Sequence, residues 1–336
     1  EFYRYEDIIK KEDDAGYDKT AFEKMLEIKG DSDHTKLIDM LTDLNDYSIG
    51  IEDVLKEHFD EENIVYWMAF QILMGNVDTQ NRNVYLYSPL NSDIWYFIAW
   101  DNDGCLMRSE YELKNFSDQG SWEKGISNYW GNVLFQRCLK SRSFREKLND
   151  AILELREYLN KDMLISKIES YKNVLKPYLY SMPDAEYEPL TSEQYDQIVA
   201  SLPDEIEKNY KLYLESLETP MPFYIGVPTI DGNKLKFNWD VSYDLDAEDI
   251  TYSVEVARDY LFQDVIYHNT TLTVPETEMD LPEAGQYFVR IRATNTSGKT
   301  QDAFDYYVTD EGKHYGMKCF YITEDSTVEE DNYEEG

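Results

Sequence analysis

The chain has 336 residues, an apolar fraction of 42% and a formal net charge of −36. Its length predicts about two or three domains, and its apolar content, which includes 29 tyrosines, allows a sizeable core. The charge argues against nucleic acid or an anionic membrane surface as a partner, because both require clustered Lys and Arg. Three widely spaced cysteines without a CxxC pair indicate neither a zinc site nor a disulfide framework. No apolar run is long enough to span a bilayer.

The N-terminal part of the chain predicts helices joined by acidic turns. Short amphipathic helices are expected at residues 22–28 and 37–44. A longer helix is expected at residues 60–74, where apolar residues recur with a helical period. Asp60 is suited to its N-cap, and Gly75 ends it as glycines commonly end helices.

The pattern then changes to that of a β-hairpin. Residues 83–87 and 94–100 have strand composition and are separated by a polar turn. Helices return after residue 130, with a break near Pro203, and are expected at 133–140, 143–160, 163–179 and 192–217. Residues 1–217 therefore predict a mostly helical domain that contains one hairpin.

The C-terminal part predicts an all-β domain. Residues 218–222 predict a linker, and beyond it the apolar period becomes two. Short strands are expected at 234–239, 251–258, 271–274, 286–294 and 303–308. This spacing predicts a β-sandwich over residues 221–310, followed by an acidic C-terminal segment over 311–336. The resemblance to a fibronectin type III domain is carried by Trp239, Tyr252, Val254, Tyr287, Val289, Ile291, Ala293 and Asn295, followed by Ser297-Gly298. The predicted fold class is a multidomain α+β protein.

Three polar residues around the expected hairpin indicate chemistry. Phosphoryl transfer from a nucleotide needs a carboxylate that accepts a proton from the attacking hydroxyl, and oxygen ligands that hold Mg²⁺ against the phosphates. Protein kinases supply these groups with a catalytic-loop Asp, an Asn after four intervening residues, and an Asp beyond a short hairpin. Asp78, Asn83 and Asp101 occur here in that order and spacing.

The surrounding residues resemble the CotH (spore coat protein H) family of atypical kinases. The family signature combines Asn-x-Asp, a following Asn before Leu-Tyr, and Trp-Asp-x-Asp. The matching residues are Asn76-x-Asp78, Asn83-x-x-Leu86-Tyr87 and Trp100-Asp101-x-Asp103-Gly104. The resemblance covers residues 1 to about 217. It implies a kinase-like fold that transfers phosphate from ATP to Ser or Thr of proteins, including spore coat proteins in some members.

The resemblance also implies roles for individual residues. Asp78 takes the catalytic-base position, and Asn83 and Asp101 take the cofactor-binding positions as Mg²⁺ ligands. Asp103 is a possible further metal ligand. The implied cofactors are ATP and Mg²⁺, and the implied partner is a protein with a Ser or Thr acceptor. Residues 1–60 show neither a Gly-rich loop nor a strand-borne Lys, so we expect the N-terminal lobe to be missing and the activity of this chain to be weak or absent.

Other interpretations stay open from the sequence. The chain could be a binding or surface-display protein, in which the kinase-like part is a scaffold and the sandwich docks a glycan or a surface protein. A glycoside hydrolase could use Asp78 with Asp101 or Asp103 as its carboxyl pair. Asp101-x-Asp103-Gly104 also matches part of a calcium-loop pattern. The sandwich favours an extracellular or cell-surface location by analogy.

Overall fold

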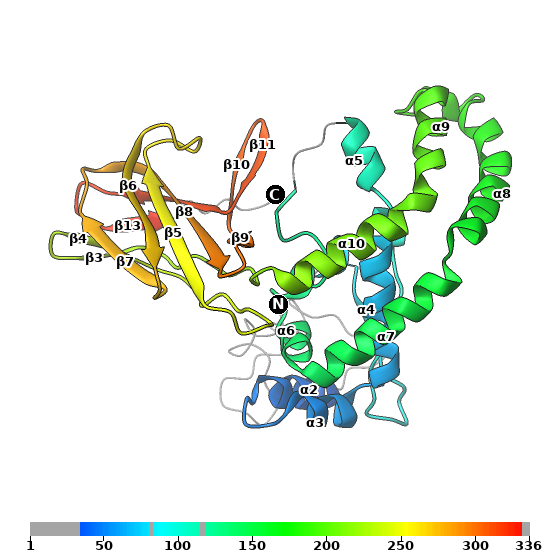
Figure 1. Cartoon of the computed structure of the whole chain (residues 1–336), viewed down its shortest axis with the longest axis horizontal. Helices are drawn as coiled ribbons and strands as arrows, with labels where there is room; N and C mark the ends of the chain where they lie inside the picture. Colours follow the sequence, from blue (N-terminus) through cyan, green and yellow to red (C-terminus); the bar gives the residue numbers. More distant parts are fainter. Residues whose placement is uncertain (1–33, 81–82, 115–118, 331–336) are drawn as a thin grey trace. The chain divides into compact units, whose positions relative to one another are not determined.

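The computed structural model describes residues 34–80, 83–114 and 119–330 (Figure 1). The helix expected at residues 22–28 lies outside the described residues. The chain divides into two compact units, Glu1–Ser109 with Asn132–Asn209 and Glu110–Gly131 with Tyr210–Gly336. Both contain regular secondary structure, and the sheets are antiparallel, so the fold is α+β overall. None of the helices in the described ranges combines the length and apolar character that a membrane crossing requires.

The first unit is mostly helical. Its helices are α2 (Thr35–Asn45), α3 (Ile51–His58), α4 (Glu61–Met74), α6 (Val133–Lys140), α7 (Arg142–Tyr158), α8 (Lys161–Leu179), α9 (Ser192–Ser201) and the beginning of α10 (Glu205–Glu218). The bounds of α2, α4, α6, α7 and α8 agree closely with the helices expected from the apolar period, whereas α3 was not expected. The break at Pro203 is a single 3₁₀ turn, η5 (Leu202–Asp204). Thr191 and Gln194 form a capping box at the start of α9.

A short hairpin lies within this unit. Strands β1 (Tyr85–Tyr87) and β2 (Tyr96–Ile98) pair antiparallel and are shorter than the sequence predicted. The hairpin tip is tied to α2, because the Lys36 ammonium group donates to the Pro89 carbonyl over 2.8 Å. This contact fixes the end of the hairpin that is remote from Asn83 and Asp101.

The second unit contains two facing antiparallel sheets. One has the strand order β3-β4-β7, and the other has the order β13-β12-β8-β5-β6, with β9 paired to β8. The strands are β3 (Thr229–Asp231), β4 (Lys234–Asn238), β5 (Ile250–Ala257), β6 (Val265–Leu272), β7 (Glu276–Asp280), β8 (Gly285–Asn295), β9 (Thr300–Asp302), β12 (Met317–Ile322) and β13 (Val328–Glu330). A separate hairpin is formed by β10 (Tyr306–Thr309) and β11 (Gly312–Tyr315).

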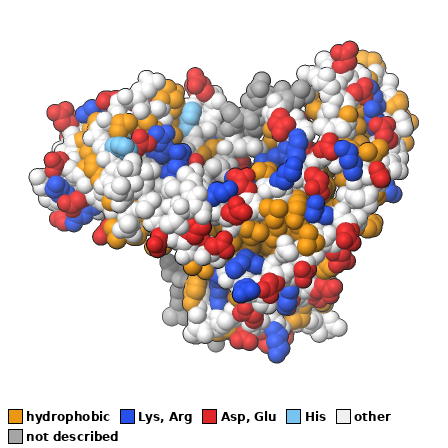
Figure 2. Space-filling model, in the orientation of Figure 1, with side chains coloured by type: hydrophobic (Ala, Val, Ile, Leu, Met, Phe, Trp, Pro, Cys, Tyr) orange, Lys and Arg blue, Asp and Glu red, His pale blue; other side chains and the backbone are white. Residues whose placement is uncertain are grey.

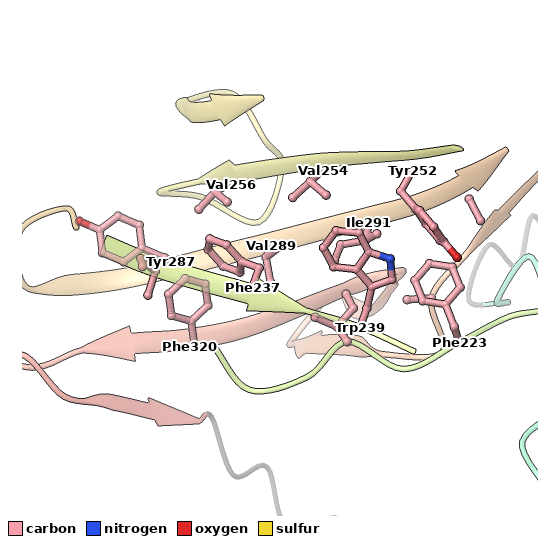
Figure 3. Close-up of a cluster of buried hydrophobic side chains, with 14 of the residues drawn as sticks. Phe223, Phe237, Trp239, Tyr252, Val254, Val256, Tyr287, Val289, Ile291 and Phe320 are labelled. Atoms are coloured by element: carbon pink, nitrogen blue, oxygen red, sulfur yellow. The ribbon is translucent and has the colours of Figure 1, made fainter. Parts of the chain in front are cut away.

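Apolar side chains from both sheets share one core (Figure 3). Phe237 and Trp239 come from the β4 side, and Val254 and Val289 come from β5 and β8. Alternate residues of these strands are buried, as expected for strands with one face on a core. The alternation that predicted the strands thus also selects the side chains that fill the core.

The β unit extends in both directions beyond the expected sandwich of residues 221–310. Strand β12 pairs with β8 along its whole length, so a strand within 311–336 belongs to the larger sheet. Residues 110–131, which the sequence placed in the helical domain, belong to the same unit. Trp122 packs against Phe304 with ring centroids 5.1 Å apart. Residues 110–131 were misplaced from the sequence because Trp122 is buried against a residue far along the chain. A local sequence pattern does not reveal such a contact.

The surface carries both signs of charge. On the face shown in Figure 2, acidic and basic side chains lie interspersed. Several of the cations are paired with carboxylates, for example Arg156 with Glu207 and Lys147 with Glu61.

Candidate functional site

Helix α4 positions the candidate site through contacts at both of its ends. Its N-cap is Asp60, whose carboxylate accepts a hydrogen bond from the Asn63 amide over 2.9 Å. It ends at Gly75, which has a φ of 65° in the left-handed region. The helix is apolar on most sides, which is typical of a helix enclosed by its own domain. Both ends were predicted from the sequence, and both are confirmed.

The C-terminal end of α4 leads directly to Asp78. Asn76 is buried, and its side-chain oxygen accepts a hydrogen bond from the backbone amide of Asp78 over 3.3 Å. The Thr79 hydroxyl donates to the Asn76 carbonyl over 3.2 Å. Such side-chain-to-backbone bonds define an Asx-type turn. The turn leaves the Asp78 carboxylate exposed, at the start of the 3₁₀ turn η1 (Asp78–Gln80).

The N-terminal end of α4 holds strand β2. The Asn63 side chain accepts from the Phe97 amide over 2.7 Å and donates to the Phe97 carbonyl over 3.1 Å. The Asn63 side chain therefore satisfies both backbone hydrogen-bonding groups of Phe97, as a paired strand would. The Phe97 ring is buried and lies 4.7 Å from the Trp67 ring, measured between centroids. These contacts determine where the chain emerges at Trp100 and Asp101.

Asn83 and Asp101 lie at the same end of the hairpin, because Tyr85 pairs with Ile98. Both have left-handed backbones, with φ angles of 53° and 49°. Asn and Asp adopt this region more readily than other residues with a Cβ atom. Strained or rare backbone conformations are frequent at functional sites, and two of the residues singled out from the sequence share one.

Three amide side chains connect the two loops. Asn102 accepts hydrogen bonds through its Oδ1 atom from Gln71 Nε2 over 3.1 Å and from Asn76 Nδ2 over 3.3 Å. Asn76 Nδ2 also donates to Gln71 Oε1 over 3.1 Å. Sequence reasoning missed Gln71 and Asn102. The available signal was a Gln within an otherwise apolar helical pattern, since a buried polar side chain requires partners.

The loop after β2 approaches Asp78 closely. A Cβ atom added to Gly104, which ends the turn η2 (Asn102–Gly104), would lie 3.2 Å from Asp78 Oδ2 and 3.3 Å from Asn76 Oδ1. Glycine is therefore the residue that permits this approach without displacement. The Leu106 amide donates to the Met74 carbonyl over 2.8 Å, which ties the same loop to the end of α4.

Cys105 is influenced by carboxylates of both loops. Partial burial raises the pKa of the Cys105 thiol to about 12, and the negative charges of Asp103 and Asp78 act in the same direction. A hydrogen bond with the Asn76 side chain lowers the pKa and opposes these effects. The protonated thiol is a poor nucleophile and a poor metal ligand at neutral pH. The chemistry of this region therefore depends on its oxygen atoms.

Helix α10 supports the same segment from another side. Asn209 is buried and donates to the Leu73 carbonyl over 3.0 Å. A Cβ atom at Gly75 would lie 2.6 Å from the Asn209 side chain. Glu205, also buried, accepts a hydrogen bond from the Ser109 amide over 2.8 Å. These supports were not predicted, because nothing local in the sequence relates residues 73–75 to residue 209.

The donor chemistry of the site fits Mg²⁺ bound with a phosphate ligand. Asp78, Asp101 and Asp103 expose carboxylates, and Asn83 adds an amide oxygen. These are hard oxygen donors, and protein sites for Mg²⁺ commonly supply one or two carboxylates while phosphates and water complete the shell. Across the described residues, no three His, Cys, Asp or Glu side chains gather in a group that could hold a metal by themselves.

Comparisons with known proteins identify the family. No curated protein matches the chain. Among solved structures, the surface layer protein SbsC, domains 1-6, matches at 11% identity and a TM-score of 0.16, over 98% of this chain and 41% of that chain. The chain thus spans less than half of that protein, and a score of this size carries no argument about fold. A family model described as CotH kinase protein matches residues 1–213, which are more than half of the sequence. The chain belongs to the CotH kinase protein family.

Proposed function

We propose that this chain carries the catalytic and metal-binding groups of a CotH-type protein kinase, which uses ATP and Mg²⁺ to phosphorylate Ser or Thr of a protein. We expect the activity of the chain by itself to be weak, because residues 1–60 offer neither a Gly-rich loop nor a strand-borne Lys. The observation that carries the proposal is the close approach of two loops: Gly104, beside Asp101 and Asp103, lies against the Asp78 carboxylate. The loops combine an exposed carboxylate with oxygen donors at the end of one hairpin. Phosphoryl transfer depends on positioning and on charge stabilisation, for which this arrangement is suited.

In the proposed mechanism, Asp78 orients the acceptor hydroxyl and takes its proton. Asn83 and Asp101 would hold Mg²⁺, and Asp103 would bind it directly or through water. When bound, the metal ion neutralises the phosphate charge. The amide of Asn83 supplies an oxygen without adding a further negative charge near the base.

Two substitutions separate these roles. Asp78→Asn should lower phosphate transfer from ATP to casein by at least about 10²-fold and leave Mg·ATP binding largely unchanged, because a general base acts in the chemical step. Asp101→Asn should weaken Mg·ATP binding, measured by calorimetry. Asp93→Asn removes an exposed carboxylate from the hairpin tip and serves as the matched control.

The experiment also distinguishes the competing functions. Measurable transfer activity that is equal in wild type, Asp78→Asn and Asp101→Asn would reject the assigned site. Absence of Mg·ATP binding by the chain, together with affinity for a glycan or a surface protein, would favour a display protein over a kinase.

We also propose that the β unit is a fibronectin type III module. The support is its strand order, β3-β4-β7 facing β6-β5-β8-β12. In addition, the Tyr287 hydroxyl at the start of β8 donates to the Glu283 carbonyl over 2.8 Å, as in the tyrosine corner of related sandwiches. Such modules are common in cell-surface proteins, so we propose an extracellular or cell-surface location with a docking or spacing role for the module. Cell fractionation with an antibody against the chain tests the location, and recovery from the cytoplasm would contradict it.

A further inference from the structure

We propose that Gln71 and Asn102 are positioning residues, which couple the loop of Asp78 to the loop of Asp101 and Asp103. The inference rests on the proposed function for its catalytic consequence. Its structural basis is the set of three mutual hydrogen bonds among Gln71, Asn76 and Asn102.

The three amides have unequal exposure, and this difference indicates what they do. Gln71 and Asn76 are buried, whereas Asn102 is partly exposed on the loop that follows β2. Asn102 therefore supplies, from a surface loop, the acceptor for two buried donors. A buried amide without a partner costs more free energy than an apolar side chain of the same shape. The buried pair thus favours the arrangement in which the Asn102 loop is in place.

The coupling reaches each carboxylate through one further contact. On one side, Asn76 Oδ1 accepts from the Asp78 amide, so the orientation of the Asn76 side chain determines the turn that presents Asp78. On the other side, Asn102 lies between Asp101 and Asp103 in the sequence. A displacement of one loop relative to the other therefore breaks the hydrogen bond between Asn76 and Asn102.

The backbone near Asn102 adds to the constraint. Its carbonyl accepts from the Cys105 amide over 3.2 Å, and Leu106 is bonded to Met74 at the end of α4. Asp101 is in a left-handed conformation immediately before this turn. The turn at Asn102 is therefore tied to α4 twice, once through the backbone at Leu106 and once through the Asn102 side chain. Two attachment points fix the orientation of the turn relative to α4 as well as its distance from the helix.

A matched pair of substitutions tests the coupling. Asn102→Ala removes the acceptor, whereas Asn102→Asp keeps an acceptor oxygen for both donors. Amide hydrogen exchange should accelerate by about tenfold in residues 76–79 of Asn102→Ala, although the substitution lies in the other loop. Asn102→Asp should retain the wild-type exchange rate there. Asn91→Ala, an exposed site at the hairpin tip, is the control.

Gln71→Glu provides a second, independent variant. It preserves the size of the side chain and replaces the donor to Asn102 with an acceptor, so exchange should accelerate in both loops. Exchange in helix α7 of the same unit, whose apolar face is buried, reports whether a variant has lost the stability of that unit as a whole. Faster exchange confined to the two loops supports coupling, and unchanged exchange in residues 76–79 of both Asn102→Ala and Gln71→Glu would overturn it.

Mg·ATP affinity supplies the catalytic readout. Asn102→Ala should weaken Mg·ATP binding by about tenfold, since it releases a loop that carries metal ligands. If wild type binds Mg·ATP and Asn102→Ala binds it equally well, the positioning role is wrong while the proposed function stands. If wild type binds no Mg·ATP, the proposed function fails, and hydrogen exchange alone decides whether the loops are coupled.

Discussion

The core of the β unit and the region around α4 differ in what holds them together. Between the two sheets, apolar side chains such as Phe237 and Val289 fill most of the space, and the free energy of burying them does not depend on direction as a hydrogen bond does. Around the ends of α4, amide side chains make directional hydrogen bonds to one another and to the backbone. The difference shows that burial of apolar surface stabilises the β unit, whereas the geometry of hydrogen bonds positions the candidate site.

The largest effect is expected from a cavity in the sandwich core. Phe237→Ala removes a ring that is 1% exposed and packs against Phe320. Substitutions of this kind cost about 3–5 kcal/mol, because transfer free energy and cavity formation add. Denaturant unfolding followed by fluorescence measures the loss. Val241→Ala, at an exposed site in the same unit, should change stability by less than about 0.5 kcal/mol.

A smaller change in stability with a larger change in function is expected at Gly104. Gly104→Ala places a Cβ atom 3.2 Å from Asp78 Oδ2 and 3.3 Å from Asn76 Oδ1, so these side chains must shift from the positions they hold beside glycine. We expect Mg·ATP affinity or phosphate transfer to fall by about tenfold or more, since small misplacements are costly for positioned groups. Thermal unfolding of the variant should remain close to wild type. If Gly104→Ala lowered stability as strongly as Phe237→Ala, the proposed difference between the two regions would be wrong.

The smallest effect is a pH dependence in the β unit. Asp305 accepts from the Ile225 amide over 2.7 Å and lies 3.3 Å from the Lys318 ammonium group. Burial nevertheless raises the pKa of its carboxyl above the ordinary value, while Lys318 opposes the shift. The folded state therefore binds this proton more tightly than the unfolded state, and the contribution to stability falls as pH rises from about 4 through the raised pKa.

Asp305→Asn imitates the protonated form and should remove that decline. Unfolding midpoints of wild type and Asp305→Asn, measured from pH 3 to pH 7, should diverge as the pH rises, with the variant relatively more stable. Asp310→Asn, at an exposed position, controls for the loss of one negative charge. Parallel profiles for wild type and Asp305→Asn would contradict the expected cost of the partly buried carboxylate.

Much of the local structure was accessible from the sequence. The caps at Asp60 and Gly75 and the helix at 133–140 are confirmed within one or two residues. Strand positions were less accurate, since β6 begins at Val265 whereas a strand was expected at 271–274. Cross-strand pairing determines where a strand starts, and β6 follows its neighbour β5 through an irregular register.

In the candidate site too, residues that belong to a short motif were predicted, whereas residues that meet only through the fold were not. Asp78, Asn83 and Asp101 were selected by spacing, and their metal and catalytic roles stay predictions. The residues that support them were not selected. Gln71 and Asn102 are 31 positions apart, and Leu73 and Asn209 are 136 positions apart. No periodic pattern relates residues at such separations.

The sequence by itself determined the family, the positions of most helices and the order of the chemically important residues. It could do so because caps, apolar periods and short motifs act over a few neighbouring residues. The tertiary structure alone placed residues 110–131 with the β unit, brought Gly104 against Asp78, and joined three amides into one cluster. These outcomes depend on which distant surfaces bury one another and on which buried polar groups find partners, and both are properties of the folded chain as a whole.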